Sequence, residues 1–140
     1  MDYKRFNNTI IARIDKGEEI LEQIENIALK ENIKLASIQG IGATNDFTIG
    51  VFEATTRKYN TYTFQGSYEI VSLLGTINTL NHEYYSHIHM SAGDDKGNVV
   101  GGHLTRAIIS FTCEITIQII DGEVDRKYDD KLGINLYSFE

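Results

Sequence analysis

The most regular pattern in the chain is a two-residue alternation across residues 107–120. The odd positions from Ile109 to Ile119 are apolar, and the even positions from Ser110 to Gln118 are polar. Because successive side chains of a strand point to opposite faces, the pattern predicts one long β-strand. Its buried face is expected to include Phe111 and Cys113.

A different period, close to 3.6 residues, covers residues 17–31 and predicts an amphipathic helix. Asp15, three residues before Glu18, resembles a capping box and is the expected N-cap. The expected buried face comprises Ile20, Leu21, Ile24, Ile27 and Ala28.

Further β-prone segments are shorter and are separated by turn residues. They cover residues 9–14, 35–38, 47–54, 62–64 and 66–77, followed by the strand that holds the histidines and a short apolar segment at 133–136. The charged residues 125–131 are expected to form a loop. The chain is therefore expected to be one α+β domain spanning residues 1–140, mainly an antiparallel β-sheet of about seven strands packed with one main helix.

Composition limits the classes of partner. At 41% hydrophobic and 24% charged residues, the sequence is typical of a folded domain. A formal charge of −7 opposes non-specific nucleic-acid binding, which depends on a positive field. The basic pairs Lys4-Arg5, Arg57-Lys58 and Arg126-Lys127 are scattered, and each is expected on a solvated turn.

Cysteine content and the N-terminus predict a location. Cys113 is the only cysteine, so an internal disulfide is excluded and a reducing cytoplasm is expected. Residues 1–8 contain no apolar signal-peptide segment, and no stretch of the chain is apolar enough to predict a membrane span.

Three of the four histidines lie within residues 87–103. On a strand, His87 and His89 would project from the same face, with Cα atoms about 6.6 Å apart. The turn-forming residues 94–98 could reverse the chain and bring His103 back beside them. This arrangement predicts a three-histidine metal site on a β-hairpin. His82, in the preceding turn, is a weaker candidate for a fourth ligand.

Two other features carry weaker signals. Gly40-Ile41-Gly42 indicates a bend or a close backbone approach, and a phosphate-binding loop is disfavoured because the rest of the dinucleotide-binding pattern is missing. Glu69 interrupts the β-prone segment 66–77, so it lies either on a solvated face or at a functional site.

Three segments together resemble the PPC (plant and prokaryote conserved) domain, also called the DUF296 family. They are Ser37-x-Gln39-Gly40-Ile41-Gly42-Ala43, then Gly66-Ser67-Tyr68-Glu69-Ile70, then His87-x-His89-x-Ser91-x-Gly93-Asp94-x-x-Gly97-x-Val99-x-Gly101-Gly102-His103-Leu104. The resemblance covers nearly the whole chain and is to the prokaryotic stand-alone type. It implies an antiparallel sheet with a packed helix, assembled as a homotrimer. It also implies a fold similar to that of α-acetolactate decarboxylases and related zinc-dependent hydrolases, which hold zinc through three histidines.

On this basis we expect His87, His89 and His103 to bind Zn²⁺ or another divalent first-row metal. One open coordination position would let the site bind or turn over a small molecule, as in a zinc-dependent hydrolase or lyase. Glu69, as a base or proton shuttle, and Arg106, as an anchor for a carboxylate, are the candidate catalytic residues.

Three alternatives stay open. The histidines could simply pack and hydrogen-bond in a trimer interface. The chain could bind DNA, as the family name suggests, although it lacks the Arg-Gly-Arg-Pro core of the plant AT-hook and has no proline. It could also be a non-catalytic trimeric interaction module, with the polar positions of 110–118 and Tyr84-Tyr85 as the contact surface.

Overall fold

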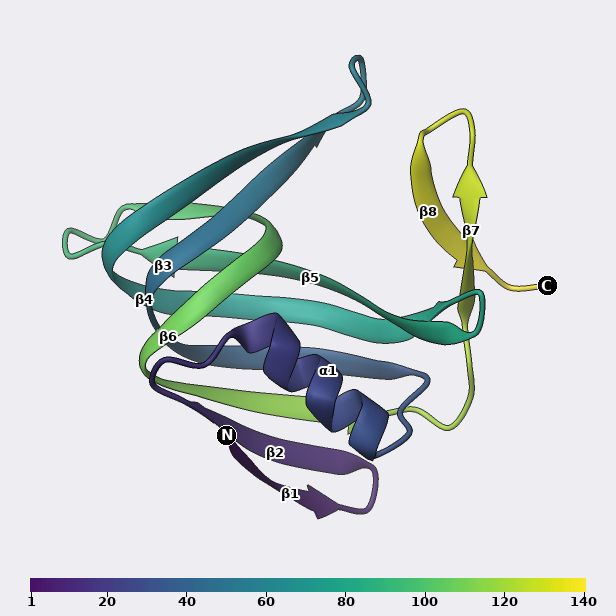
Figure 1. Ribbon diagram of the computed structural model, residues 1–140, viewed down its shortest axis with the longest axis horizontal. Coiled ribbons are helices and arrows are strands. Elements are labelled where there is room, and N and C mark those ends of the chain that lie inside the picture. The colour runs from purple at the N-terminus through teal and green to yellow at the C-terminus, as the bar shows by residue number, and fades with distance from the viewer.

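The computed structural model describes residues 1–140 and confirms the α+β class, with one helix and eight strands (Figure 1). The helix α1 spans Ile20–Lys30. The strands are β1 (Asp2–Phe6), β2 (Thr9–Asp15), β3 (Ala36–Glu53), β4 (Lys58–Leu80), β5 (Glu83–Gly93), β6 (Val99–Ile119), β7 (Asp125–Asp129) and β8 (Ile134–Ser138). The helix is neither long enough nor apolar enough to cross a membrane.

Six strands form one antiparallel sheet in the order β1-β2-β6-β3-β4-β5. The start of β6 also pairs with β5, so strands β3 to β6 close on themselves. β7 and β8 form a separate hairpin that stands beside the turn between β4 and β5 (Figure 1). This closure places the end of β5 next to the start of β6.

The hydrophobic core lies between α1 and one face of the sheet. Ile20, Ile24 and Ile27 of the helix are fully buried, as the 3.6-residue period predicts. They belong to a cluster of 24 buried residues that includes Ile88 and Met90 of β5. The residues that alternate with these two, His87 and His89, therefore point to the face of the sheet away from the helix.

The helix begins later than predicted, and Asp15 is not its N-cap. Glu19 caps α1, and its carboxylate accepts a hydrogen bond from the backbone N–H of Glu22 at 2.8 Å. Asp15 and Glu18 are instead bound by the amino group of Met1 at 2.8 and 2.7 Å. Only half of the indicated capping box is present: Glu18 accepts a hydrogen bond from the backbone N–H of Asp15 at 2.8 Å, while the Asp15 carboxylate binds Met1 instead of capping the helix.

The strands are longer than predicted, because bulges rather than turns separate the β-prone segments. β3 is one strand with register shifts at Gly40/Gly42 and Thr44/Asp46. Gly42 confirms the close approach expected of the glycine pair: an added Cβ would lie 2.5 Å from the carbonyl oxygen of Thr112. The absence of a side chain there lets β3 and β6 pack against each other.

Phe111 was predicted to be buried with the other odd positions of its strand, and this is wrong. Its side chain is 77% exposed, whereas Ile109 and Cys113 are buried. The reason is an irregularity in pairing: Gly42 pairs with Cys113 and Thr44 with Ile109, so β6 has two extra residues at this point. Such a bulge releases the intervening side chains from the alternation.

The charged segment 125–131 was predicted to be a loop, but Asp125–Asp129 forms strand β7. Its partner is β8, with Arg126 opposite Tyr137. Arg126 was expected to be exposed to solvent, but it is only 7% exposed. Pairing with β8 and burial of this one side chain make the segment ordered, and neither is visible as a sequence pattern.

Candidate metal centre

The three histidines come from the hairpin formed by β5 and β6, as predicted. His89 pairs directly with His103, and His87 lies two residues earlier on the same face of β5. The chain reverses through Asp94, whose carboxylate accepts hydrogen bonds from the backbone N–H groups of Lys96 and Asn98, each at 2.9 Å. Gly97 has a positive φ of 81°. These turn contacts fix the register that brings His103 opposite His89.

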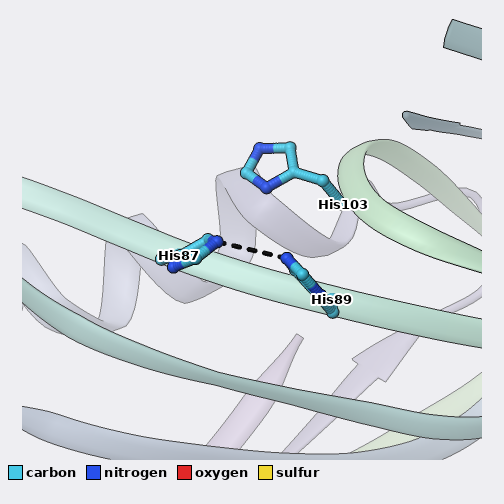
Figure 2. A group of neighbouring side chains, drawn as sticks. All are labelled: His87, His89 and His103. Carbon is cyan, nitrogen blue, oxygen red and sulfur yellow. Dashed lines mark hydrogen bonds between the residues drawn. The ribbon is translucent and has the colours of Figure 1, made fainter. Parts of the chain in front are cut away.

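The imidazole nitrogens converge on one point, and Figure 2 shows the three rings turned toward one another. Nε2 of His87 lies 3.2 Å from Nε2 of His89. One ligand nitrogen from each residue lies within 4.8 Å of the others. Two nitrogens bound to one tetrahedral zinc ion at roughly 2.0–2.1 Å would be about 3.3 Å apart. The spacing of the cluster therefore suits ligands that share one ion.

The surroundings favour the neutral form of His87 and His103, which is the form that binds metal. Burial lowers the pKa of His87 to about 4, assisted by His103, His89 and the Arg126 cation. Burial also lowers the pKa of His103, with a further contribution from His89. Nδ1 of His103 is buried without a hydrogen-bond partner. An unpartnered buried nitrogen is costly for the protein, and a bound metal ion would satisfy it.

The ring of His103 also has an aromatic neighbour. The centroid of Tyr59, from the β4 side of the β3–β4 hairpin, lies 5.0 Å from the His103 centroid. Phe52 of the same hairpin packs against Tyr59 at a tilt of 58°, with the ring centroids 5.3 Å apart. Aromatic rings therefore cover this side of the cluster.

His82 lies outside the three-histidine cluster. Its Nδ1 is 2.7 Å from Oε1 of Glu123, and this carboxylate raises the pKa of His82. Asp125 completes the group around it, and all three residues are on the surface or only partly buried. His82, the weaker candidate for a fourth ligand, therefore lies with Glu123 and Asp125 and not with the three other histidines.

The two candidate catalytic residues, Glu69 and Arg106, are not among the clustered side chains. Glu69 is exposed and lines a surface hollow with Lys16 and Asp94. It lies five residues from Leu74, the pairing partner of His89, which is about 16 Å along β4. Arg106 makes a two-pronged ion pair with Asp46, at 2.9 and 3.0 Å. Their catalytic roles stay predictions.

Sequence reasoning missed a second group of side chains on the face that holds the histidines. Arg126 of β7 lies between the rings of Tyr85 and Tyr137, at 5.0 and 4.4 Å from their centroids. Its Nε donates to Oδ1 of Asn78 at 3.3 Å. The sequence placed Arg126 in a solvated turn because the β7–β8 hairpin was not recognised.

Comparisons with known proteins give the family of the chain. A family model described as the Plants and Prokaryotes Conserved (PCC) domain matches residues 1–121. A solved structure of a candidate DNA-binding protein from Bacteroides thetaiotaomicron is 31% identical, with a TM-score of 0.96 over 99% of this chain and 96% of that chain. A plant- and prokaryote-conserved protein from Pyrococcus horikoshii is 33% identical, with a TM-score of 0.86 over 98% of this chain and 93% of that chain.

Two further comparisons concern the metal and the fold. A structure described as a metal-containing protein from Archaeoglobus fulgidus is 29% identical, with a TM-score of 0.88 over 99% of both chains. Acetolactate decarboxylase from Bacillus subtilis is 16% identical, with a TM-score of 0.58 over 83% of this chain and 54% of that chain. At that identity the likeness shows a shared fold alone, as predicted. No curated protein matches the sequence.

Proposed function

This chain belongs to the Plants and Prokaryotes Conserved domain family, and we propose that its histidine hairpin binds a zinc ion that in turn binds a small molecule. The observation that carries the proposal is the convergence of three imidazole nitrogens within 4.8 Å, one of the rings having a buried nitrogen without a partner. A relative from Archaeoglobus fulgidus is described as metal-containing, and this supports metal binding by the present chain. Zinc is the first choice because three neutral histidines with a free position are typical of its catalytic sites.

Each residue of the hairpin has a defined part in the proposal. His87 and His89 would supply nitrogens from one face of β5, held by the pairing of β5 with β4 and β6. His103 would supply the third nitrogen from the opposing strand, and a three-histidine zinc site of this type keeps one coordination position for a small molecule. Bound zinc would supply a Lewis acid for a small molecule with an oxygen ligand.

Metal content after single substitutions tests this proposal. His87→Ala, His89→Ala and His103→Ala should each lose zinc, because two histidines bind it far more weakly than three. Purified protein would be loaded with zinc, dialysed and measured by inductively coupled plasma mass spectrometry. His82→Ala is the matched control and should keep one zinc per chain, since His82 is bound to Glu123. Equal zinc content in all four variants would overturn the proposal.

Glu69 and Arg106 are proposed helpers only, and this part of the proposal is independent of metal binding. Glu69→Gln and Arg106→Gln should keep the zinc, since neither residue belongs to the cluster. A role in turnover would require each side chain to reach the bound molecule, as a base or as a carboxylate anchor. Turnover by both variants at the wild-type rate, with a molecule that the wild type converts, would remove these roles.

We infer that the chain assembles as a homotrimer, as the family resemblance implies. An exposed apolar surface on the sheet supports this inference: Ile41 is 58% exposed and Leu74 is 56% exposed. Val71 lines adjoining hollows with Ile41, Leu74 and Phe111. Apolar surface of this kind is typical of interaction sites, and sedimentation equilibrium would give the mass of the assembly.

DNA binding is the second candidate function, because two similar solved structures, from Bacteroides thetaiotaomicron and Ralstonia eutropha, are named as candidate DNA-binding proteins. The charge of −7 acts against it. A fluorescence titration with duplex DNA at low salt distinguishes the two candidates. Binding that weakens steeply with added salt would support the DNA function.

A further inference from the structure

The β7–β8 hairpin brings a buried cation to the histidine face of the sheet. Arg126 is 7% exposed, and none of the ion pairs of the protein includes it. Buried arginines are rarely found without a carboxylate, because desolvation of a charge is costly. The lack of a counter-ion therefore calls for a physical explanation.

The protein holds this guanidinium by contacts that do not neutralise it. Tyr85 and Tyr137 place their rings over its carbon Cζ, and Asn78 and the backbone carbonyl of Asn135 accept from Nε and Nη1 at 3.3 and 2.8 Å. Nη2 makes no hydrogen bond within the protein. The cation is thus held in place with part of its donor fork unused, as in a preformed anion site.

A second polar group beside Arg126 also lacks an acceptor. Nδ2 of Asn78 is buried without a hydrogen-bond partner, while Oδ1 of the same amide is occupied by Arg126. The group therefore has more donors than acceptors. This imbalance favours a ligand that supplies hydrogen-bond acceptors.

The sheet places this cation next to the proposed metal centre. One face of β5 carries Tyr85, His87 and His89 in succession. The Cα atoms of each neighbouring pair are about 6.6 Å apart. Tyr137, which covers Arg126, donates from its hydroxyl to Oγ1 of Thr76 at 3.0 Å, and Thr76 is the pairing partner of His87. One molecule of a few atoms could therefore reach both the cation and the histidines.

We propose that Arg126 binds the carboxylate of a small organic anion. A second oxygen-containing group of the same molecule would reach the three-histidine centre. The inference rests on the proposed function and adds the class of ligand to it. A carboxylate matches the planar donor fork of arginine and would supply the missing counter-charge. Arg106 is less suited to this role because Asp46 already occupies its fork.

Cobalt-substituted protein allows the metal and the anion site to be followed separately. The visible spectrum of bound Co²⁺ would report binding at its open position during titration with malonate, used as the probe anion. Arg126→Gln should raise the Kd for malonate by about 10- to 100-fold, the scale of a lost charge-assisted hydrogen bond. The Kd for imidazole, a neutral metal ligand, should not change.

Two variants serve as controls. Arg13→Gln removes an exposed arginine that pairs with Asp15 on β2, and it should keep the malonate affinity. Arg126→Lys keeps the charge between the two tyrosines but loses the planar fork, so a several-fold weaker affinity is expected. It also provides a folded comparison if the glutamine variant is unstable.

The outcomes separate the two proposals. If the wild-type protein shows no visible spectrum of bound Co²⁺ after cobalt loading, the proposed metal centre is overturned. An intact spectrum with equal malonate affinity in the wild type and a folded Arg126 variant would overturn the anion site alone. If both variants unfold, the Nε resonance of Arg126 in the ¹⁵N-labelled wild type decides, because malonate bound at the guanidinium must shift it.

Discussion

Gly42 is one of the residues at which two backbones of the sheet approach each other closely. A Cβ at this position would lie 2.5 Å from the carbonyl oxygen of Thr112 and 2.7 Å from Cα of Cys113. Both neighbours are backbone atoms of β6, so neither can rotate away. The short contact explains, at the scale of one atom, why β3 tolerates no side chain where it bends.

Substitution of this glycine should therefore destabilise the fold. Gly42→Ala is expected to lower the free energy of unfolding by about 1–3 kcal/mol, the usual effect of an overpacked site. Urea denaturation followed by circular dichroism would measure the change. Gly93→Ala is the matched control, because its Cβ would meet only ordinary contacts at 3.5 Å or more. Equal stability of the two variants would contradict this account.

The four long strands β3 to β6 form the element that supports the metal centre. Phe47 of β3 lies inside it, is fully buried, and contacts the rings of Phe64 and Tyr68 of β4 at 5.2 and 5.1 Å. These contacts join β3 to β4, which carries Tyr59, and β3 also pairs with β6, where Gly50 lies opposite His103. Packing at Phe47 is therefore expected to determine how firmly the hairpin is held.

Phe47→Ala should cost about 3–5 kcal/mol of unfolding free energy, through lost burial and the cavity left behind. Thermal and urea unfolding would both show the loss. Phe139→Ala removes the same ring from a position that is 83% exposed and should leave stability unchanged. A small effect at position 47 would mean that the neighbouring rings collapse into the space.

For the molecule as a whole, several ion pairs predict lower stability in acid. Arg106 holds the pKa of Asp46 below its usual value, and Arg5, assisted by Tyr3, does the same for Glu31. A carboxylate whose pKa is lower in the folded state stabilises the protein above its unfolded pKa. That contribution is lost as the pH falls from about 4 through the folded-state values.

Asp46→Asn isolates one of these contributions. The variant should be less stable than the wild type at pH 7, and the difference should shrink as the pH falls from about 4, because Asp46 is protonated first in the unfolded state and at a lower pH in the folded state. Urea midpoints measured from pH 7 to pH 2 would test the sign. A stability difference that is the same at every pH would show that the ion pair is not its source.

How far the sequence predicts the structure differs between the elements. The 3.6-residue period located α1, and the spacing of His87, His89 and His103 located the hairpin that brings the three rings together, because both depend on local geometry. The exposed Phe111 and the strand at Asp125–Asp129 were not predictable in this way. The first depends on a mismatch of register between β3 and β6, and the second on a partner strand.

The sequence by itself thus determined the α+β class, the family resemblance and the three histidines, because alternation and turn residues act over a few positions. Only the tertiary structure decided that Arg106 is occupied by Asp46 and that Arg126 is buried beside the histidine face without a counter-ion. Asp46 and Arg106 are 60 residues apart in the chain, and Asn78 and Arg126 are 48 residues apart. Contacts over such separations depend on the order and register of the strands, which no local pattern encodes.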